Sequence, residues 1–144
     1  MPSTLRVSAE LPNLAVIRGF VEDTAAALDV GPGLIVDMVQ AVDEAVTNVI
    51  VHGYRGQPGD IEIEMDREQD ALVVRLRDHA FPFDPTRAPP PDLTLPLEAR
   101  RLGGLGIHLI RQFTDAMLYR LTFDGSNELT LIGKHIDLAN GGDT

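Results

Sequence analysis

The most informative stretch of this sequence is residues 44–54, which read Glu44-Ala45-Val46-Thr47-Asn48-Val49-Ile50-Val51-His52-Gly53-Tyr54. The stretch contains the C-terminal end of a predicted helix. We predict this helix from about Gly33 to His52, because apolar residues recur there at helical spacing. They mark one buried face: Ile35, Val39, Val42, Val46 and Val49. Gly53 suits the left-handed position just past the helix end, where glycine has no Cβ to clash.

The polar side of the same helix carries a second pattern at positions i, i+3, i+4, i+7 and i+8: Gln40, Asp43, Glu44, Thr47 and Asn48. Glu44 and Asn48 therefore point the same way. One interpretation is the solvated face of an amphipathic helix. The other is a site in which Glu44 acts as a general base and the Asn48 amide oxygen binds Mg²⁺, a cation that prefers oxygen ligands. The pair alone does not choose between them.

Further elements are predicted on both sides of this helix. Residues 4–9 alternate apolar and polar side chains like a half-buried strand, and a helix is predicted from about Asn13 to Leu28. Later strands are predicted at 61–65, 71–77, 116–123 and 128–136, with a short helix at about 103–113. This order suits an α+β two-layer sandwich, in which about three helices cover one face of a mixed, mainly antiparallel sheet.

Asp78 is predicted at the tip of the strand at 71–77, ahead of a proline-rich loop that runs from Pro82 to Pro96. It is either a turn-forming residue or part of a binding site. In a binding site, its carboxylate would be shielded by Phe81 and Phe83. It would then accept a hydrogen bond from a flat polar ligand such as a purine amino group.

Glycines open the helix at 103–113, in the order Gly103-Gly104-Leu105-Gly106. Glycines at a helix start let backbone N–H groups approach a phosphate, and the helix dipole favours the negative charge. The spacing is not the Walker A pattern, and no strand immediately precedes it as a dinucleotide fingerprint requires. A glycine-rich hinge without a ligand is the alternative.

Composition limits the possible partners. The 144 residues include 12 Lys and Arg against 22 Asp and Glu, a formal net charge of −10. Direct binding to nucleic acid or to an anionic membrane is therefore not expected, because it needs clustered Lys and Arg. The chain has no cysteine, which excludes disulfides, thiolate catalysis and Cys-ligated zinc. It has neither an apolar leader nor a run of about eighteen apolar residues, so a cytoplasmic location is expected.

Taken in order, these motifs resemble those of one family. Residues 44–54 closely resemble the N box of the anti-sigma-factor serine kinases, which belong to the ATPase superfamily shared by gyrase, heat-shock chaperones, histidine kinases and mismatch-repair proteins. Residues 78–85 are similar to the family's first glycine box, and residues 103–110 are similar to its second. Residues 115–131 resemble its final hairpin. The resemblance extends from the first strand to about Ile136.

The resemblance implies one Bergerat-type ATP-binding domain over residues 1–144, with an ATP lid at about 85–102 and a short polar tail at 137–144. It implies that Glu44 activates the attacking hydroxyl and that Asn48 holds Mg²⁺ against the ATP phosphates. By the same resemblance, Asp78 receives the adenine amino group.

The resemblance assigns the remaining contacts to the second glycine box and the final hairpin. The backbone of the glycine-box residues wraps the phosphates: Gly103, Gly104, Leu105 and Gly106. A hydroxyl near the adenine comes from Thr130, with Ser126 as the alternative.

Ala80 departs from the family pattern, which has glycine two residues after the Asp of the first glycine box. A methyl group there would narrow the adenine pocket, and alanine does not readily adopt a positive φ. Lower nucleotide affinity is therefore expected, without loss of binding.

The resemblance implies an ATP-dependent protein serine/threonine kinase that acts as an anti-sigma factor. Such a protein sequesters a sigma factor and phosphorylates an anti-sigma-factor antagonist, and a homodimer would be in keeping with the family. The alternative is a regulatory binding module of the same fold with weak or no kinase activity. Ala80 favours the binding module, whereas Glu44 and Asn48 favour the kinase.

Overall fold

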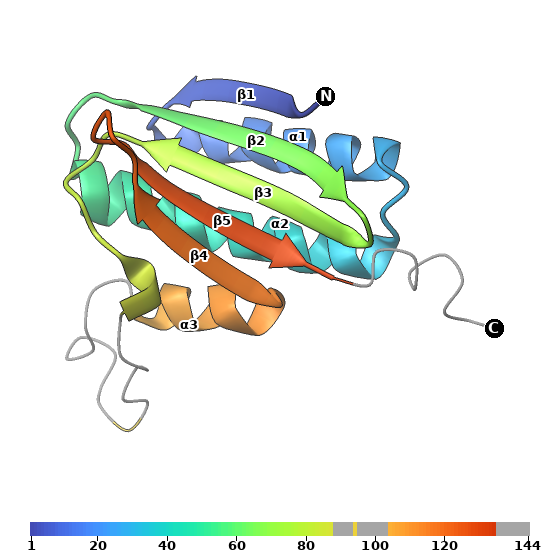
Figure 1. Cartoon of the computed structure of the whole chain (residues 1–144). Helices are drawn as coiled ribbons and strands as arrows, with labels where there is room; N and C mark the ends of the chain where they lie inside the picture. The colour runs from blue at the N-terminus through green and yellow to red at the C-terminus, as the bar shows by residue number, and fades with distance from the viewer. Residues whose placement is uncertain (88–93, 95–103, 135–144) are drawn as a thin grey trace.

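The computed structural model of the chain describes residues 1–87, 94 and 104–134. A five-stranded sheet lies against three α-helices, which all cover the same face (Figure 1). The strands are β1 (Ser3–Ser8), β2 (Asp60–Glu68), β3 (Ala71–Asp78), β4 (Ala116–Leu121) and β5 (Asn127–Gly133). The helices are α1 (Leu14–Ala27), α2 (Pro32–Asn48) and α3 (Gly104–Phe113). Short helical turns are η1 (Leu11–Asn13), η2 (Val49–Tyr54) and η3 (Pro85–Arg87).

The sheet confirms the predicted α+β class. Its strand order is β1-β2-β3-β5-β4, and every pair of neighbouring strands is antiparallel. In the register of the central strands, Asp78 of β3 stands opposite Ile61 of β2 on one side and Asn127 of β5 on the other. The last residue of β3 is therefore placed directly beside the first residue of β5.

The core lies between the helices and the sheet. From α1 it includes Ile17, Val21 and Ala25, which repeat every four residues. Val42 and Val46 of α2 are buried as predicted. The other predicted apolar positions of α2 are only partly buried and pack against the core: Ile35, Val39 and, just after the helix, Val49. The buried face is completed by Met38, Ala41 and Ala45.

The end of α2 differs from the prediction. The helix continues into the π-helical turn η2, and Arg55, with φ 54°, takes the left-handed position before Gly56 at φ 83°. The expectation that Gly53 occupies that position is therefore wrong. Gly53 lies inside η2, where a Cβ would stand 3.0 Å from the Ala80 Cβ. Its missing side chain makes room for the chain after β3.

The other face of the sheet carries a ladder of ion pairs. Arg77 contacts Glu62, Glu64 and Glu128 at 2.7–3.1 Å. Arg120 contacts Glu128 at 2.6 Å, and these partners hold the Glu128 pKa below its usual value, chiefly through the Arg120 hydrogen bond. Alternate residues of the central strands thus pair charges on this face and fill the core on the other. Among the described residues, no helix has the length and apolar character needed to cross a membrane.

Candidate functional site

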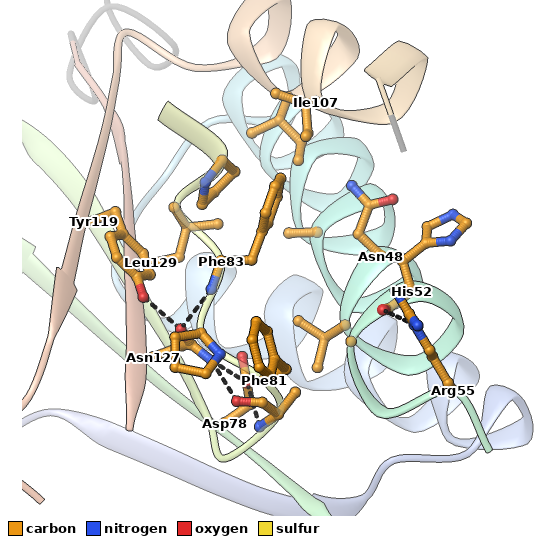
Figure 2. Close-up of a pocket in the computed structure, with 17 residues that line it drawn as sticks. Asn48, His52, Arg55, Asp78, Phe81, Phe83, Ile107, Tyr119, Asn127 and Leu129 are labelled. Atoms are coloured by element: carbon orange, nitrogen blue, oxygen red, sulfur yellow. Dashed lines mark hydrogen bonds between the residues drawn. The ribbon is translucent and has the colours of Figure 1, made fainter. Parts of the chain in front are cut away.

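A cavity of about 600 Å³ opens between the helices and the end of the sheet where β3 finishes. The helical side contributes Asn48, His52 and Ile107 to its lining. The strands contribute Asp78, Tyr119 and Asn127, which face the helical residues across the cavity (Figure 2). Several segments distant in the sequence therefore meet at one concave site, as is usual for small-molecule binding.

The polar side of α2 is half-buried from Asp43 to Asn48, where α3 packs against the helix, and Gln40 remains exposed. Glu44 and Asn48 both face Gly106: a Cβ there would stand 3.0 Å from Glu44 Oε2 and 3.3 Å from Asn48 Nδ2. Asn48 lines the cavity, and Glu44 lies one helical turn before it. The interpretation of this stripe as a purely solvated face therefore does not hold at these two residues.

The Glu44 carboxyl has a raised pKa. Burial is the larger cause, and the negative charge of Asp43 adds to it. Asp43 is itself paired with Arg18 of α1, whose Nε lies 2.7 Å from Asp43 Oδ1. A carboxyl group with a raised pKa beside a cavity is suited to exchange protons with a ligand or substrate.

The second glycine box is described in part. Gly103 lies outside the described residues, Gly104 begins α3, and Gly106 stands beside Glu44 and Asn48. Leu105 lies in the first turn of the helix. The first N–H groups of a helix lack partners within the helix, so the start of α3 offers donors next to Asn48.

Asp78 ends β3 and is only 7% exposed. Its Oδ1 accepts hydrogen bonds from Ala80 N and from Asn127 Nδ2, each at 2.9 Å. Within the described part of the chain, Oδ2 has no hydrogen-bond partner, and Asp78 lines the cavity. Burial raises the Asp78 pKa, while the hydrogen bonds from Asn127 and Ala80 oppose that shift. One carboxylate oxygen is thus left to accept a hydrogen bond from a ligand.

Ala80 occupies the position where the family pattern has glycine. It is buried, lines the cavity, and places its Cβ against Gly53. Among the described residues, the non-glycine positions with positive φ are Asp29, Arg55 and Gln69. The backbone at Ala80 therefore does not need the conformation that would have favoured glycine. Whether the methyl group lowers nucleotide affinity stays a prediction.

Thr130 does not lie where the sequence analysis expected it. It shares a face of β5 with Glu128, two residues away, and Glu128 pairs with arginines on the face opposite the helices. Thr130 is not among the residues that line the cavity, and neither is Ser126, whose Oγ lies 3.3 Å from a ring nitrogen of His79. The structure thus corrects the placement of a Thr130 hydroxyl near the ligand.

Asn127 is the polar residue of β5 that reaches the cavity, and the sequence analysis missed it. Its side chain hydrogen bonds with Asp78, Ala80, Phe83 and Tyr119 (Figure 2). In the sequence it belongs to the turn Asp124-Gly125-Ser126-Asn127, where asparagine is common for local reasons. Only its pairing with Asp78 across β3 and β5 distinguishes it, and that signal depends on the strand register.

The chain after β3 forms one wall of the cavity. Phe81 and Phe83 line it, although they remain 83% and 56% exposed. Beyond them, Arg111 of α3 donates hydrogen bonds to the carbonyl oxygens of Pro85 and Thr86, at 3.2 and 2.7 Å. The start of the predicted lid is therefore attached to the helix that follows the lid. Apart from residues 85–87 and 94, the predicted lid lies outside the described residues, as does the tail at 137–144.

The described residues contain no group of three or more His, Asp or Glu side chains that could hold a metal ion. The Asn48 amide and the Glu44 carboxyl place oxygen atoms that could bind a cation beside Gly106, near the start of α3. A magnesium ion at this place would fit a site with few protein ligands, because Mg²⁺ usually retains water and binds substrate phosphates.

Comparison with known proteins agrees with this geometry. Residues 7–132 match the histidine kinase-like ATPase domain. The chain is 33% identical over 90 residues to the serine/threonine-protein kinase BtrW of Bordetella bronchiseptica, a match that covers 62% of this chain and 63% of that protein. It is 29% identical over 115 residues to the serine-protein kinase RsbW of Bacillus cereus, covering 77% of this chain and 72% of that one.

A solved structure shares the fold. It contains the RsbU and RsbW domains of a Mycobacterium tuberculosis protein and superposes with a TM-score of 0.65 at 16% identity. The match covers 93% of this chain and 32% of that chain. The chain therefore spans less than two thirds of the length of BtrW and about a third of the solved two-domain chain.

Proposed function

Because the chain belongs to the histidine kinase-like ATPase domain family, we propose that it is an ATP-dependent protein serine/threonine kinase that acts as an anti-sigma factor. The main support is that one cavity has Asp78 at one end and Asn48 beside the start of α3. The kinase names of BtrW and RsbW support the same reaction.

In this proposal the nucleotide base lies at the end of the cavity where β3 finishes. Asp78 Oδ2 accepts a hydrogen bond from the adenine amino group, since Oδ1 is already occupied by protein donors. The phosphates lie toward the glycine-rich start of α3. Unpaired backbone N–H groups and the helix dipole favour their negative charge there.

Phosphoryl transfer then depends mainly on position and charge. When bound, Mg²⁺ would neutralise charge on the phosphates, and Asn48 is the residue that would hold it. Glu44 stands one turn earlier on α2 and accepts the proton of the attacking serine or threonine hydroxyl. Its raised pKa suits a base that must release that proton again.

The proposed partners are an anti-sigma-factor antagonist, which supplies the hydroxyl, and a sigma factor, which the protein sequesters. A homodimer and a cytoplasmic location form part of the same proposal. With a net charge of −10, an effect on transcription would pass through these proteins rather than through direct contact with nucleic acid.

The decisive experiment combines the protein with labelled ATP, Mg²⁺ and the cognate antagonist. We expect label on a serine or threonine of the antagonist, and we expect Asn48→Asp to weaken metal and nucleotide binding together. Calorimetry on the wild type provides the counter-test. If no heat of binding is measured at millimolar ATP, the kinase proposal is wrong and the regulatory binding module takes its place.

A further inference from the structure

Asn127 uses its whole hydrogen-bonding capacity inside the cavity wall. Its Nδ2 donates to Asp78 Oδ1 at 2.9 Å and to the Ala80 carbonyl oxygen at 3.0 Å. Its Oδ1 accepts from Phe83 N at 3.3 Å and from the Tyr119 hydroxyl. A primary amide has two donors and two acceptor sites, so all four are occupied.

This pattern permits one orientation of the amide. A flipped amide would turn its oxygen toward two acceptors, the Asp78 carboxylate and the Ala80 carbonyl, and its nitrogen toward the Phe83 N–H donor. The hydrogen-bond network itself therefore directs Nδ2 at Asp78. With Ala80 N on the same oxygen, Asp78 Oδ1 is saturated and the carboxylate cannot rotate without losing both bonds.

Burial makes these contacts strong determinants of geometry. Asn127 is 6% exposed and Asp78 is 7% exposed, so water has little access to replace a lost partner. The two residues stand opposite each other on β3 and β5, and Tyr119 approaches from the neighbouring edge strand β4. Three strands thus hold one carboxylate group.

We propose that Asn127 is a positioning residue for nucleobase recognition: it holds Asp78 with Oδ2 toward the cavity, so that the site selects purine nucleotides carrying a 6-amino group. The inference rests on the proposed nucleotide site and gives a role to a residue that the sequence analysis did not single out. A purine with a 6-oxo group would present an acceptor to an acceptor and be rejected. Because all four hydrogen-bonding positions of Asn127 are occupied by protein groups, none is left for the base.

The test compares binding of ATP and ITP, which differ at the 6 position of the purine, by calorimetry on the whole chain. We expect the wild type to bind ATP at least about tenfold more tightly than ITP, as loss of a buried hydrogen bond to a charged group implies. Asn127→Ala is expected to weaken ATP binding about tenfold and ITP binding much less. The ratio of the ITP Kd to the ATP Kd should therefore fall toward one.

Tyr119→Phe is the second variant, because it removes one hydroxyl and keeps the ring. Losing one of the two donors to Asn127 Oδ1 is expected to lower the ATP preference by about two- to fivefold. The matched control is Leu118→Ala. Leu118 is the preceding residue of β4, is 56% exposed, and lies on the other face of the sheet. It is expected to leave the preference unchanged.

The outcomes separate this inference from the proposed function. A wild type that binds neither nucleotide would overturn the nucleotide site and the inference with it. A wild type that prefers ATP, together with a folded Asn127→Ala variant that keeps the full preference, would overturn the role of Asn127 alone. If Asn127→Ala does not give a cooperative thermal transition, an unchanged preference in Tyr119→Phe overturns it instead.

Discussion

Gly106 of α3 lies directly against Glu44 of α2: a Cβ on the glycine would stand 3.0 Å from the Glu44 Oε2 atom. That distance is shorter than ordinary van der Waals contact, so the missing side chain lets the two helices meet here. The contact brings the start of α3 to the acid and amide of the N-box segment. Several consequences can be measured directly.

Gly106→Ala is expected to separate activity from stability. The new methyl group must displace Glu44 or Asn48, whose Nδ2 would lie 3.3 Å away, so phosphoryl transfer should fall. The higher helix propensity of alanine is worth about 0.5–1 kcal/mol, and the displacement of these side chains offsets part of it, so little net change in stability is expected. The measurements are a transfer assay and thermal unfolding.

The control for this variant is Gly19→Ala in α1, where a Cβ meets nothing within 4 Å. It should give the stability gain alone. Equal transfer rates in Gly106→Ala and Gly19→Ala would show that the close contact with Glu44 has no catalytic importance.

Glu44→Gln should slow transfer by about 100-fold or more, while ATP binding is largely retained, because a neutral amide cannot accept the proton. In the wild type, burial and then Asp43 raise the pKa of Glu44. The acid limb of the rate profile should therefore lie above the usual pKa of a glutamate.

The same shift has a consequence for stability. Because the Glu44 pKa is higher in the folded state than in the unfolded state, ionisation of Glu44 destabilises the fold as pH rises through the folded pKa. Glu44→Gln should therefore unfold at a higher temperature than the wild type at pH 7. The difference should vanish below the unfolded pKa, and a difference that persists there would contradict the assignment.

Asp78→Asn should reverse the choice of base. Its Oδ1 would keep the hydrogen bonds from Ala80 and Asn127, which turns the new Nδ2 toward the cavity. A donor would then face the amino group of ATP but would match the 6-oxo group of ITP. We expect ATP affinity to fall about 10- to 100-fold and ITP affinity to rise, as measured by calorimetry. Equal loss of both nucleotides would instead indicate a collapsed pocket.

Gly53 and Ala80 should behave as a coupled pair. Gly53→Ala places two methyl carbons 3.0 Å apart and should destabilise the protein by about 1–3 kcal/mol. Ala80→Gly removes the opposing methyl group, so the double variant Gly53→Ala/Ala80→Gly should recover most of that loss. Urea unfolding of the wild type, both single variants and the double variant measures the coupling. If the changes in unfolding free energy of the two single variants add up to that of the double variant, the two residues are not energetically coupled.

Arg111→Lys should loosen the start of the loop after β3. A single atom, Arg111 Nη2, donates to the carbonyl oxygens of both Pro85 and Thr86. A lysine places its nitrogen one bond closer to the backbone, so it does not reach both oxygens in the same geometry. We expect faster amide hydrogen exchange at Thr86 and Arg87 and a loss of nucleotide affinity of about threefold. Arg120→Lys, on the open face of the sheet, is the matched control. Unchanged exchange at Thr86 would refute the role of Arg111.

Local patterns predicted most of the elements. The strand at 71–77, the helix at 103–113 and the turn after residue 123 were all found close to their expected bounds. Hydrophobic periodicity and turn-forming residues act over a few positions, so the helices, strands and turns that they determine can be predicted from the sequence. At the end of α2 they failed, because Gly53 is needed for contact with Ala80 rather than for a left-handed turn.

The sequence by itself determined the class of fold, the antiparallel hairpins and the positions of Glu44, Asn48 and Asp78 on their elements. Only the tertiary structure decided which side chains meet. Asn127 contacts Asp78 because of the register between β3 and β5, and Gly106 contacts Glu44 because α3 approaches α2 closely. Such contacts depend on packing between segments far apart in the chain. Thr130 has a hydroxyl that could contact a ligand, but it lies on the face of β5 away from the cavity. Successive residues of a strand point to opposite faces, and the packing of the helices decides which face borders the cavity.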